Sequence, residues 1–359
     1  MPLCSFSPDV KKGLIDNHNL TDFRISIIIP ARNEEKNLDK LFKSLKTQSF
    51  KPHEIILVND QSTDMTVEVA KNNGIKVINI KSLPNGWLGK PWACFTGAKN
   101  SSGNILLFLD ADTELHKDGL ENLLLCYLKY KGVITVQPYH KIKKIYENFA
   151  AYFNLVLMGS MNVFTPLQRV SKPIGAFGPC LLCDRTSYFS IGGHGSAKSK
   201  VLEDLEIGKK FIKNNTNVFC FGGKGTIDFR MYPDGIKSVV NGFSRGFSSG
   251  AKSTSILNLI LIVLWISISF YPLTLFFGSA ISFNLIEFIT GVVFYIAYAL
   301  QLNWMLKRIG NFSPLVPLFF PLFVNFFIII FLWSIIANIF KINIKWKERT
   351  INHRTKNKK

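Results

Sequence analysis

Two carboxylates one residue apart follow the most apolar strand-like segment of the chain. Residues 105–109 (ILLFL) lead directly into Asp110 and Asp112. A short continuous apolar run predicts a central parallel strand covered on both faces, and ligands of open α/β sheets bind beyond the carboxyl ends of such strands. Two acids in one crevice repel each other unless a cation offsets their charge. The pattern indicates a Mg²⁺ or Mn²⁺ site for a diphosphate, because hard cations prefer carboxylate and phosphate oxygens; an Asp helix cap after a strand is the simpler alternative.

Other strand-like segments also end in polar residues. The residues 30–34 (PARNE) follow one such segment, and Asn59-Asp60 follow another. Adjacent parallel strands bring their carboxyl ends to one edge of the sheet. At that edge Asp60 could hold the base and ribose hydroxyls of a nucleotide. Arg32 and Lys90 could assist with the base or the diphosphate.

Strand-like and helix-like segments alternate up to about residue 221. The expected strands are residues 23–33, 54–60, 75–80, 105–109, 133–139 and 217–221, and the expected helices are residues 34–48, 62–73, 91–100, 114–131 and 202–213. This alternation predicts an α/β fold with a doubly wound, mostly parallel sheet. The chain has no GxxxxGK[ST] pattern and no GxGxxG after the first strand, which argues against a P-loop enzyme and a dinucleotide oxidoreductase.

The composition changes at residue 256. From there to residue 340 the only acidic or basic side chains are Glu287, Lys307 and Arg308. This region contains three long apolar stretches: residues 256–278, 281–305 and 312–340. Each is long enough to cross a hydrocarbon core of about 30 Å, and none has the polar face of a soluble helix. The chain is therefore predicted to be a multi-pass protein of the cell membrane.

The charge distribution predicts the orientation. The N-terminus shows no apolar signal segment, so the globular part is expected in the cytoplasm. The net charge of +19 includes a basic tail, residues 341–359, which favours the cytoplasmic face and anionic lipids rather than a nucleic-acid partner. Three full crossings would place that tail on the far side. One stretch is therefore expected to be re-entrant or interfacial, and the Pro-rich start of residues 312–340 is the favoured part.

These observations divide the chain into four regions. They are an N-terminal extension (1–23), a cytoplasmic globular domain (24–250), transmembrane or re-entrant helices (256–340) and a basic cytoplasmic tail (341–359). Residues 146–165 are apolar and form either a buried helix or an interfacial helix that admits a lipid. Cys180 and Cys183 are interpreted as buried free thiols rather than zinc ligands, because no second pair follows at a suitable spacing.

Five strings occur in order between about residues 24 and 250: IIIPARNEE, VNDQSTD, GWLGKPWA, LDAD and LEDLEIG. Their order and spacing resemble family 2 glycosyltransferases of the GT-A fold. The resemblance implies a nucleotide-sugar donor bound with a divalent metal, Mg²⁺ or Mn²⁺. The residues expected at the donor are Pro30, Ala31, Arg32, Glu34, Asp60, Lys90 and Asp110.

The same resemblance assigns Asp112 to the metal and Asp204 to the catalytic base, with Asp110 as a second metal ligand. Inverting transfer needs a base that takes the proton of the acceptor hydroxyl as it attacks C1. Adjacent side chains of a helix point about 100° apart, so one of Glu203 and Asp204 is expected to face the crevice. We favour Asp204, with Glu203 second; a solvated acidic helix turn is the alternative without chemistry.

Further features bear on the reaction. The QxxRW motif of processive family members is absent, which indicates transfer of a single sugar. Arg245 lies in the comparable place and is expected to assist the diphosphate leaving group. His194 either contacts the donor or acceptor or belongs to a Gly-rich turn. Residues 136–164, with AFGP, GGH and FRMY, resemble bacterial carotenoid glycosyltransferases of the 4,4'-diaponeurosporenoate type, which implies UDP-glucose as donor and a lipid acceptor.

Two alternatives stay open at this point. A polyprenyl-phosphate glycosyltransferase would need a basic site for the acceptor phosphate, which Lys141, Lys143 and Lys144 could supply. A catalytically silent membrane protein that binds nucleotide-sugars is a second possibility, from another functional class. The intact carboxylates at all the expected places argue against it.

Overall fold

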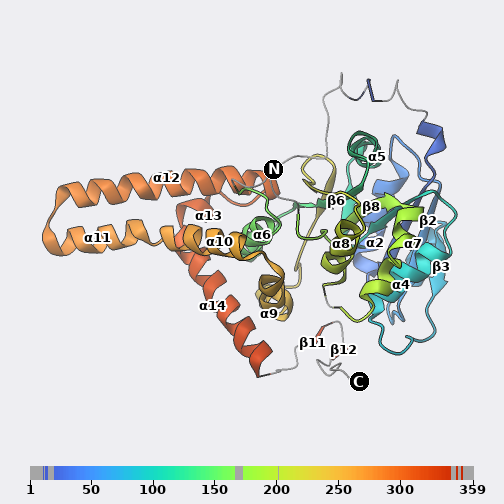
Figure 1. The fold of residues 1–359 in the computed structure, drawn as a ribbon. Helices are drawn as coiled ribbons and strands as arrows, with labels where there is room; N and C mark the ends of the chain where they lie inside the picture. The colour runs from blue at the N-terminus through green and yellow to red at the C-terminus, as the bar shows by residue number, and fades with distance from the viewer. Residues whose placement is uncertain are drawn as a thin grey trace. The chain divides into compact units, whose positions relative to one another are not determined.

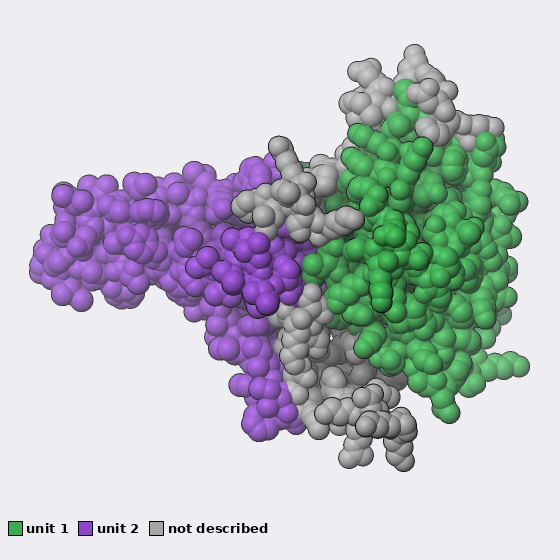
Figure 2. All heavy atoms as spheres, viewed as in Figure 1, with its two compact units in different colours: residues 1–139, 173–230, 345–359 green, residues 140–172, 231–344 purple. Residues whose placement is uncertain are grey.

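The computed structural model describes residues 20–165, 173–200 and 202–340, together with residues 11, 13, 14, 345, 346, 349 and 350. Only the backbone is described for residues 245–249, 251–253, 338, 345, 346, 349 and 350. Figure 1 shows the elements, and Figure 2 shows that the chain forms two compact units. Unit 1 contains residues 1–139, 173–230 and 345–359, and unit 2 contains residues 140–172 and 231–344. Residues 140–172 and 231–250 thus group with the apolar helices rather than with the rest of the predicted globular domain.

Unit 1 contains a seven-stranded sheet. Its strands lie in the order β3 (Lys76–Asn79), β2 (Glu54–Asn59), β1 (Ile25–Ala31), β4 (Ile105–Leu109), β8 (Cys180–Asp184), β6 (Val133–Gln137) and β9 (Val218–Gly222). All adjacent pairs are parallel except those of β8, which runs antiparallel to both β4 and β6. The mostly parallel sheet was predicted, but β8 was not. Cys180 and Cys183 lie on this strand as buried free thiols, as expected.

Helices cover both faces of this sheet. They are α2 (Glu35–Lys46), α3 (Thr66–Asn72), α4 (Gly89–Lys99), α5 (Gly119–Tyr130), α7 (Arg185–Ser190) and α8 (Glu203–Lys213). On one face Ile27 and Ile29 of β1 share a core with residues of α2 and α5. On the other face Ile28 shares a core with residues of α4 and α8. The alternation of side chains along a strand therefore gives the apolar run of β1 two buried faces.

Smaller elements complete unit 1. Strand β5 (Thr113–Leu115) pairs antiparallel with β10 (Ile227–Phe229), and β7 (Tyr139–His140) is the third strand of that sheet. The remaining elements are the 3₁₀ helices η1 (Leu20–Asp22) and η4 (Gly193–Ala197) and the strands β11 (Lys345–Trp346) and β12 (Arg349–Thr350). Because β5 pairs with β10, residues 114 and 115 belong to a strand and not to the helix predicted over residues 114–131.

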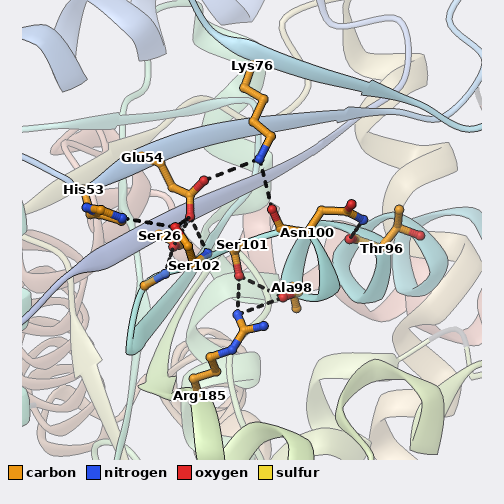
Figure 3. A network of polar contacts seen from close by, with 11 residues as sticks. Ser26, His53, Glu54, Lys76, Thr96, Ala98, Asn100, Ser101, Ser102 and Arg185 are labelled. Carbon is orange, nitrogen blue, oxygen red and sulfur yellow. Dashed lines mark hydrogen bonds and ion pairs between the residues drawn. The ribbon is translucent and has the colours of Figure 1, made fainter.

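A polar network joins the amino ends of the strands (Figure 3). The Glu54 carboxylate accepts hydrogen bonds from the Ser26 hydroxyl (2.8 Å) and from the Ser102 backbone N–H and hydroxyl (2.6 and 2.9 Å), and it lies 3.6 Å from Lys76. Burial raises the pKa of Glu54, but these hydrogen bonds and the Lys76 charge outweigh it and lower the pKa to about 2. Nearby, the Arg185 guanidinium donates to the Ser101 hydroxyl at 2.6 Å. The network fixes the sheet at the edge opposite the predicted site.

Unit 2 consists mainly of helices. They are η2 (Ile145–Ala150), α6 (Ala151–Ser160), α9 (Ile236–Ser253), α10 (Ile256–Ile268), α11 (Tyr271–Ser282), α12 (Leu285–Ile309), α13 (Leu315–Leu318) and α14 (Phe320–Ile339). Three helical segments of the described chain are long and apolar enough to cross a membrane: Ile256–Ser282, Leu285–Ile309 and Phe320–Ala337. The Pro-rich start of the third predicted stretch contains the separate short helix α13. These helices support membrane association.

The apolar helices of unit 2 pack against one another through aromatic side chains. Helices α11 and α12 run side by side (Figure 1), and the Phe276 ring of α11 lies against Tyr295 of α12 with ring centroids 6.1 Å apart. Trp265 of α10 stacks on Tyr298 of α12 at 5.6 Å. Helix α6 is largely buried among these helices, and its Tyr152 lies 5.8 Å from Trp265. Within unit 2, residues 151–160 therefore form a largely buried helix, and the entry of a lipid along residues 146–165 stays a prediction.

Candidate active site

The carboxyl ends of β1 and β2 bring the predicted nucleotide residues together. The Asp60 backbone N–H donates to the Ala31 carbonyl at 2.8 Å, and Arg32 Nη1 donates to the Asp60 carbonyl at 2.9 Å. Asp60 is buried, whereas Pro30 and Arg32 are half-buried. The half-buried Glu34 accepts a hydrogen bond from the Asn37 amide at 2.8 Å. The two strand ends thus form one edge, as the sequence predicted, and the contacts of these residues with a nucleotide stay a prediction.

Asp64, which lies just before α3, has a structural role at this edge. Its carboxylate accepts hydrogen bonds from the backbone N–H of Glu35 at 3.1 Å and of Thr66 at 3.0 Å. Burial raises the pKa of Asp64, but the hydrogen bonds from Thr66 and Glu35 outweigh this effect and lower it. The side chain therefore joins the starts of α2 and α3, where backbone N–H groups lack partners within their own helix.

The end of β4 forms a tight turn that carries both acids of the DAD motif. The Asp110 carbonyl accepts hydrogen bonds from the Thr113 backbone N–H (3.2 Å) and hydroxyl (2.8 Å). The Asp110 N–H donates to the Pro179 carbonyl at 3.0 Å, which fixes the turn against the start of β8. Asp110 and Asp112 are both half-buried. The antiparallel strand that sequence reasoning missed therefore helps to position the first acid of the motif.

Lys90, in the first turn of α4, brings the acids of two distant segments together. Its Nζ lies 2.8 Å from Asp110 Oδ1, 3.3 Å from Asp204 Oδ2 and 3.5 Å from Glu203 Oε1. Lys90 was predicted to contact the donor, and its role there stays a prediction. Lys90 is therefore one cation that is shared by Asp110, at the end of β4, and by Glu203 and Asp204, at the start of α8.

The electrostatics of this cluster follow from burial and charge. Burial alone would lower the pKa of Lys90, but the carboxylates of Asp110, Asp204 and Glu203 raise it well above its usual value. Burial, together with the Asp204 charge, raises the pKa of Glu203, and burial also raises the pKa of Asp204 despite the opposing charge of Lys90. The Glu203–Asp204 pair therefore holds a proton more readily than exposed carboxyls do, while Lys90 stays charged.

Helix α8 begins at Glu203, so both predicted base candidates lie in its first turn. Both reach Lys90, although the helical geometry was expected to turn only one of them toward the crevice. A Cβ at Gly178 would stand 2.4 Å from Asp204 Oδ2. Glycine at this position therefore leaves the space that the Asp204 carboxylate occupies. Sequence reasoning missed the role of Gly178, and the Gly-Pro pair of AFGP was the available signal.

His194 lies beside the Asp204 carboxylate rather than on an exposed turn. It is 1% exposed, and its Nε2 is 4.0 Å from Asp204 Oδ1. Its Nδ1 is 2.9 Å from the hydroxyl oxygen of Tyr188, a fully buried residue that sequence reasoning did not single out. Burial lowers the pKa of His194 to about 3, and the Lys90 charge acts in the same direction. Arg245, the remaining predicted donor contact, lies in α9 at a position for which only the backbone is described.

The residues at the end of β4 fit a divalent metal that arrives with a diphosphate. Among the described residues no group of three or more His, Cys, Asp and Glu side chains is arranged to hold a metal ion alone. Mg²⁺, however, is usually held by one or two carboxylates, with substrate phosphates and water completing the coordination. Asp110 and Asp112 supply that donor set on one turn.

Comparison with known proteins defines the class. The family model for glycosyl transferase family 2 matches residues 26–187. A mannosyltransferase from Pyrobaculum calidifontis, solved in complex with GDP-mannose and Mn²⁺, has the same GT-A fold, with a TM-score of 0.54 and 12% sequence identity over 95% of this chain and 90% of that one. The predicted α/β class is thereby confirmed.

Two curated relatives narrow the family. A 4,4'-diaponeurosporenoate glycosyltransferase of Staphylococcus haemolyticus is 40% identical over 67% of this chain and 65% of that protein. A protein with the same name from Staphylococcus aureus strain USA300 is 35% identical over 88% of this chain and 85% of that protein. The chain thus spans just under two thirds of the first relative and more of the second. It belongs to glycosyl transferase family 2 and is similar to these bacterial enzymes, as its sequence motifs predicted.

Proposed function

We propose that this glycosyltransferase moves a single glucose from UDP-glucose to a carotenoid acid, with inversion at C1. The observation that carries the proposal is the position of Lys90 Nζ within 3.5 Å of Asp110, Glu203 and Asp204. One cation thus connects the predicted donor edge of the sheet with the predicted base. The names of the curated relatives support the carotenoid acceptor, and the apolar helices support its delivery from a bilayer.

In the proposed reaction an acceptor oxygen attacks C1 of the sugar while the bond from C1 to the diphosphate oxygen breaks. A hydroxyl acceptor transfers its proton to Asp204. A carboxylate acceptor is already ionised near pH 7 and has no proton to lose. Burial raises the pKa of Asp204 and favours its protonated form, and the charge of Lys90 opposes this effect only in part. Lys90 therefore limits the rise in the pKa of the proposed base.

A divalent metal would be held by Asp112 and Asp110 in this proposal. When bound, it would neutralise the charge that develops on the leaving diphosphate. Arg32 and Asp60, which are hydrogen-bonded to each other at the β1–β2 edge, would hold the nucleoside. Pro30, Ala31 and Glu34 would shape the same edge of the donor site.

We further propose that the protein is a multi-pass protein of the cell membrane whose catalytic unit faces the cytoplasm. The first two apolar segments are antiparallel neighbours, and Lys307 and Arg308 occupy the last turn of α12. Basic residues next to membrane segments favour the cytoplasmic side. Both ends of this helical pair would then lie on the side where nucleotide-sugars are made.

The test uses membranes from cells that produce the full chain. They are incubated with labelled UDP-glucose and the carotenoid acid, with and without EDTA, and the lipids are extracted. We expect a labelled carotenoid that mild alkali cleaves, because a sugar linked to a carboxylate is an ester, and we expect EDTA to suppress the labelling. An alkali-stable product would indicate a hydroxyl acceptor, labelled polyprenyl phosphate would favour the alternative acceptor, and no labelled lipid would contradict the proposal.

A further inference from the structure

Tyr188 and His194 form a buried pair next to the proposed base. Tyr188 lies in α7 and His194 in η4, and both are excluded from solvent. The His194 backbone N–H donates to the Tyr188 hydroxyl oxygen at 3.0 Å, and the same oxygen lies 2.9 Å from His194 Nδ1. At Gly193, whose φ is +51°, a Cβ would stand 2.4 Å from the Tyr188 ring. The backbone is thus held against the tyrosine at a position where only glycine fits without strain.

The hydrogen bonds within this pair favour one tautomer of His194. The Tyr188 oxygen already accepts the His194 backbone N–H, and its own proton has His194 Nδ1 as an acceptor at hydrogen-bond distance. Burial lowers the pKa of His194 to about 3, so the ring is neutral and carries one proton. If Nδ1 accepts from Tyr188, that proton lies on Nε2. The imidazole then presents an N–H on the side that faces Asp204.

This Nε2 has no hydrogen-bond partner within the part of the chain that the structure describes, and its nearest carboxylate oxygen is Asp204 Oδ1 at 4.0 Å. A buried donor without an acceptor costs about 1–3 kcal/mol. Hydrogen bonds of catalytic groups are often long before substrate binds and shorten in the complex. A movement of about 1 Å between these two side chains would form the hydrogen bond that the buried N–H lacks.

We propose that Tyr188 and His194 are positioning residues that orient Asp204: Tyr188 fixes the tautomer of His194, and His194 Nε2–H donates to the Asp204 carboxylate when the donor is bound. This inference rests on the proposed function, because it assumes that Asp204 is the base. Lys90, Glu203, Asp110 and Cys94 are the other titratable groups that act on the same carboxylate.

The test compares two variants of similar size. His194→Gln keeps an N–H donor near the position of Nε2, whereas His194→Met keeps the volume without the donor. The readout is transfer of glucose to a carotenoid alcohol, or to water, since both acceptors must lose a proton. We expect His194→Met to lower kcat about 100-fold, as for a catalytic group displaced by about 1 Å, with the KM of UDP-glucose unchanged. His194→Gln should recover most of that loss.

Two results separate positioning from a general loss of structure. In an Asp204→Asn background, His194→Met should have no further effect on kcat, since coupled residues are not additive. The acid limb of the kcat–pH profile should move to higher pH in His194→Met, because a carboxylate without that hydrogen bond takes up its proton more readily. Additive losses, an unmoved profile, or a raised acceptor KM in place of a lowered kcat would each overturn the proposal.

The tautomer is tested without any turnover. In protein labelled with ¹⁵N-histidine, the ring nitrogens of His194 should show a proton on Nε2, and Tyr188→Phe should remove or mix this tautomer. A proton on Nδ1 in the wild-type protein would overturn the inference even if the enzyme is active. Failure of the wild-type protein to transfer sugar would instead contradict the proposed function and leave this measurement valid.

Discussion

Gly178→Ala adds a single methyl group next to the carboxylate of Asp204, the proposed base. The added Cβ would stand 2.4 Å from Asp204 Oδ2, whereas ordinary van der Waals contact begins near 3.4 Å. The carboxylate must therefore move by about 1 Å. A displacement of that size can cost about 100-fold in rate, or about 2.7 kcal/mol of activation free energy. The clash involves the end of a side chain that can rotate, so the stability loss should be only about 1 kcal/mol.

The assay measures kcat and the KM of UDP-glucose with a carotenoid alcohol, together with the melting temperature. We expect kcat to fall about 100-fold while the KM of UDP-glucose changes little. Gly195→Ala is the matched control, because its Cβ would meet Trp87 at 3.5 Å, an ordinary contact. A folded Gly178→Ala protein with wild-type kcat would refute the reasoning, since Asp204 would then not depend on the space that this glycine leaves.

Three further predictions concern the acids. Asp204→Asn should lower transfer to a hydroxyl acceptor by at least about 100-fold and transfer to a carboxylate acceptor far less; equal losses in a two-acceptor assay would exclude its role as base. Asp112→Asn should weaken Mn²⁺ binding, measured by electron paramagnetic resonance with UDP present, about 10-fold relative to the exposed-site variant Glu68→Gln, and unchanged binding would argue against the metal assignment. The lowered pKa of Glu54, about 2 instead of 4.5, stabilises the fold above pH 4.5 and loses that effect as the pH falls toward 2. Glu54→Gln should therefore lower the free energy of unfolding at pH 7 by up to about 3 kcal/mol and flatten its acid dependence in thermal melts; a variant as stable as wild type would contradict this.

The sheet of unit 1 was predictable where local pattern and tertiary pairing agree. Strands β1, β2 and β4 are apolar runs that end in polar residues, and the parallel topology places those ends together. Strand β8 is also a short apolar run, but its local sequence does not show whether its neighbours in the sheet run parallel or antiparallel to it. Its pairing with β4 joins segments about 75 residues apart in the chain. Such pairings are decided by tertiary contacts rather than by local propensity.

Helix α9 was also not predicted, because tertiary contacts rather than local sequence decide its formation. Helix α9 forms over residues 236–253, a Gly- and Ser-rich region for which no helix was expected from the sequence. The Ser334 hydroxyl of α14 donates to the Ser244 carbonyl of α9 at 2.7 Å, a contact that no local pattern indicates. In this case packing between helices outweighs the weak intrinsic propensity of Gly and Ser.

Some residues of the candidate site could be predicted from local sequence patterns, and others could not. Asp110, Asp112, Glu203 and Asp204 were found from the sequence because acids at strand ends and helix starts leave a local signal. The contact of Lys90 with Asp110, Glu203 and Asp204 left no local signal in the sequence, because these partners lie 20 and more than 110 residues away from Lys90. Tyr188 was missed because it lies in a short, mostly polar segment, RTSYFS, whose local pattern does not show that this side chain is buried.

The order of the elements along the chain has a consequence for biosynthesis. All seven strands of the large sheet are complete at Gly222, and the first apolar helix starts at Ile256. Synthesis proceeds at about 5–20 residues per second, and N-terminal domains generally fold first. Unit 1 therefore has its full sheet available before any membrane segment is made. We expect the nascent chain to reach the membrane with the large sheet of unit 1 already formed.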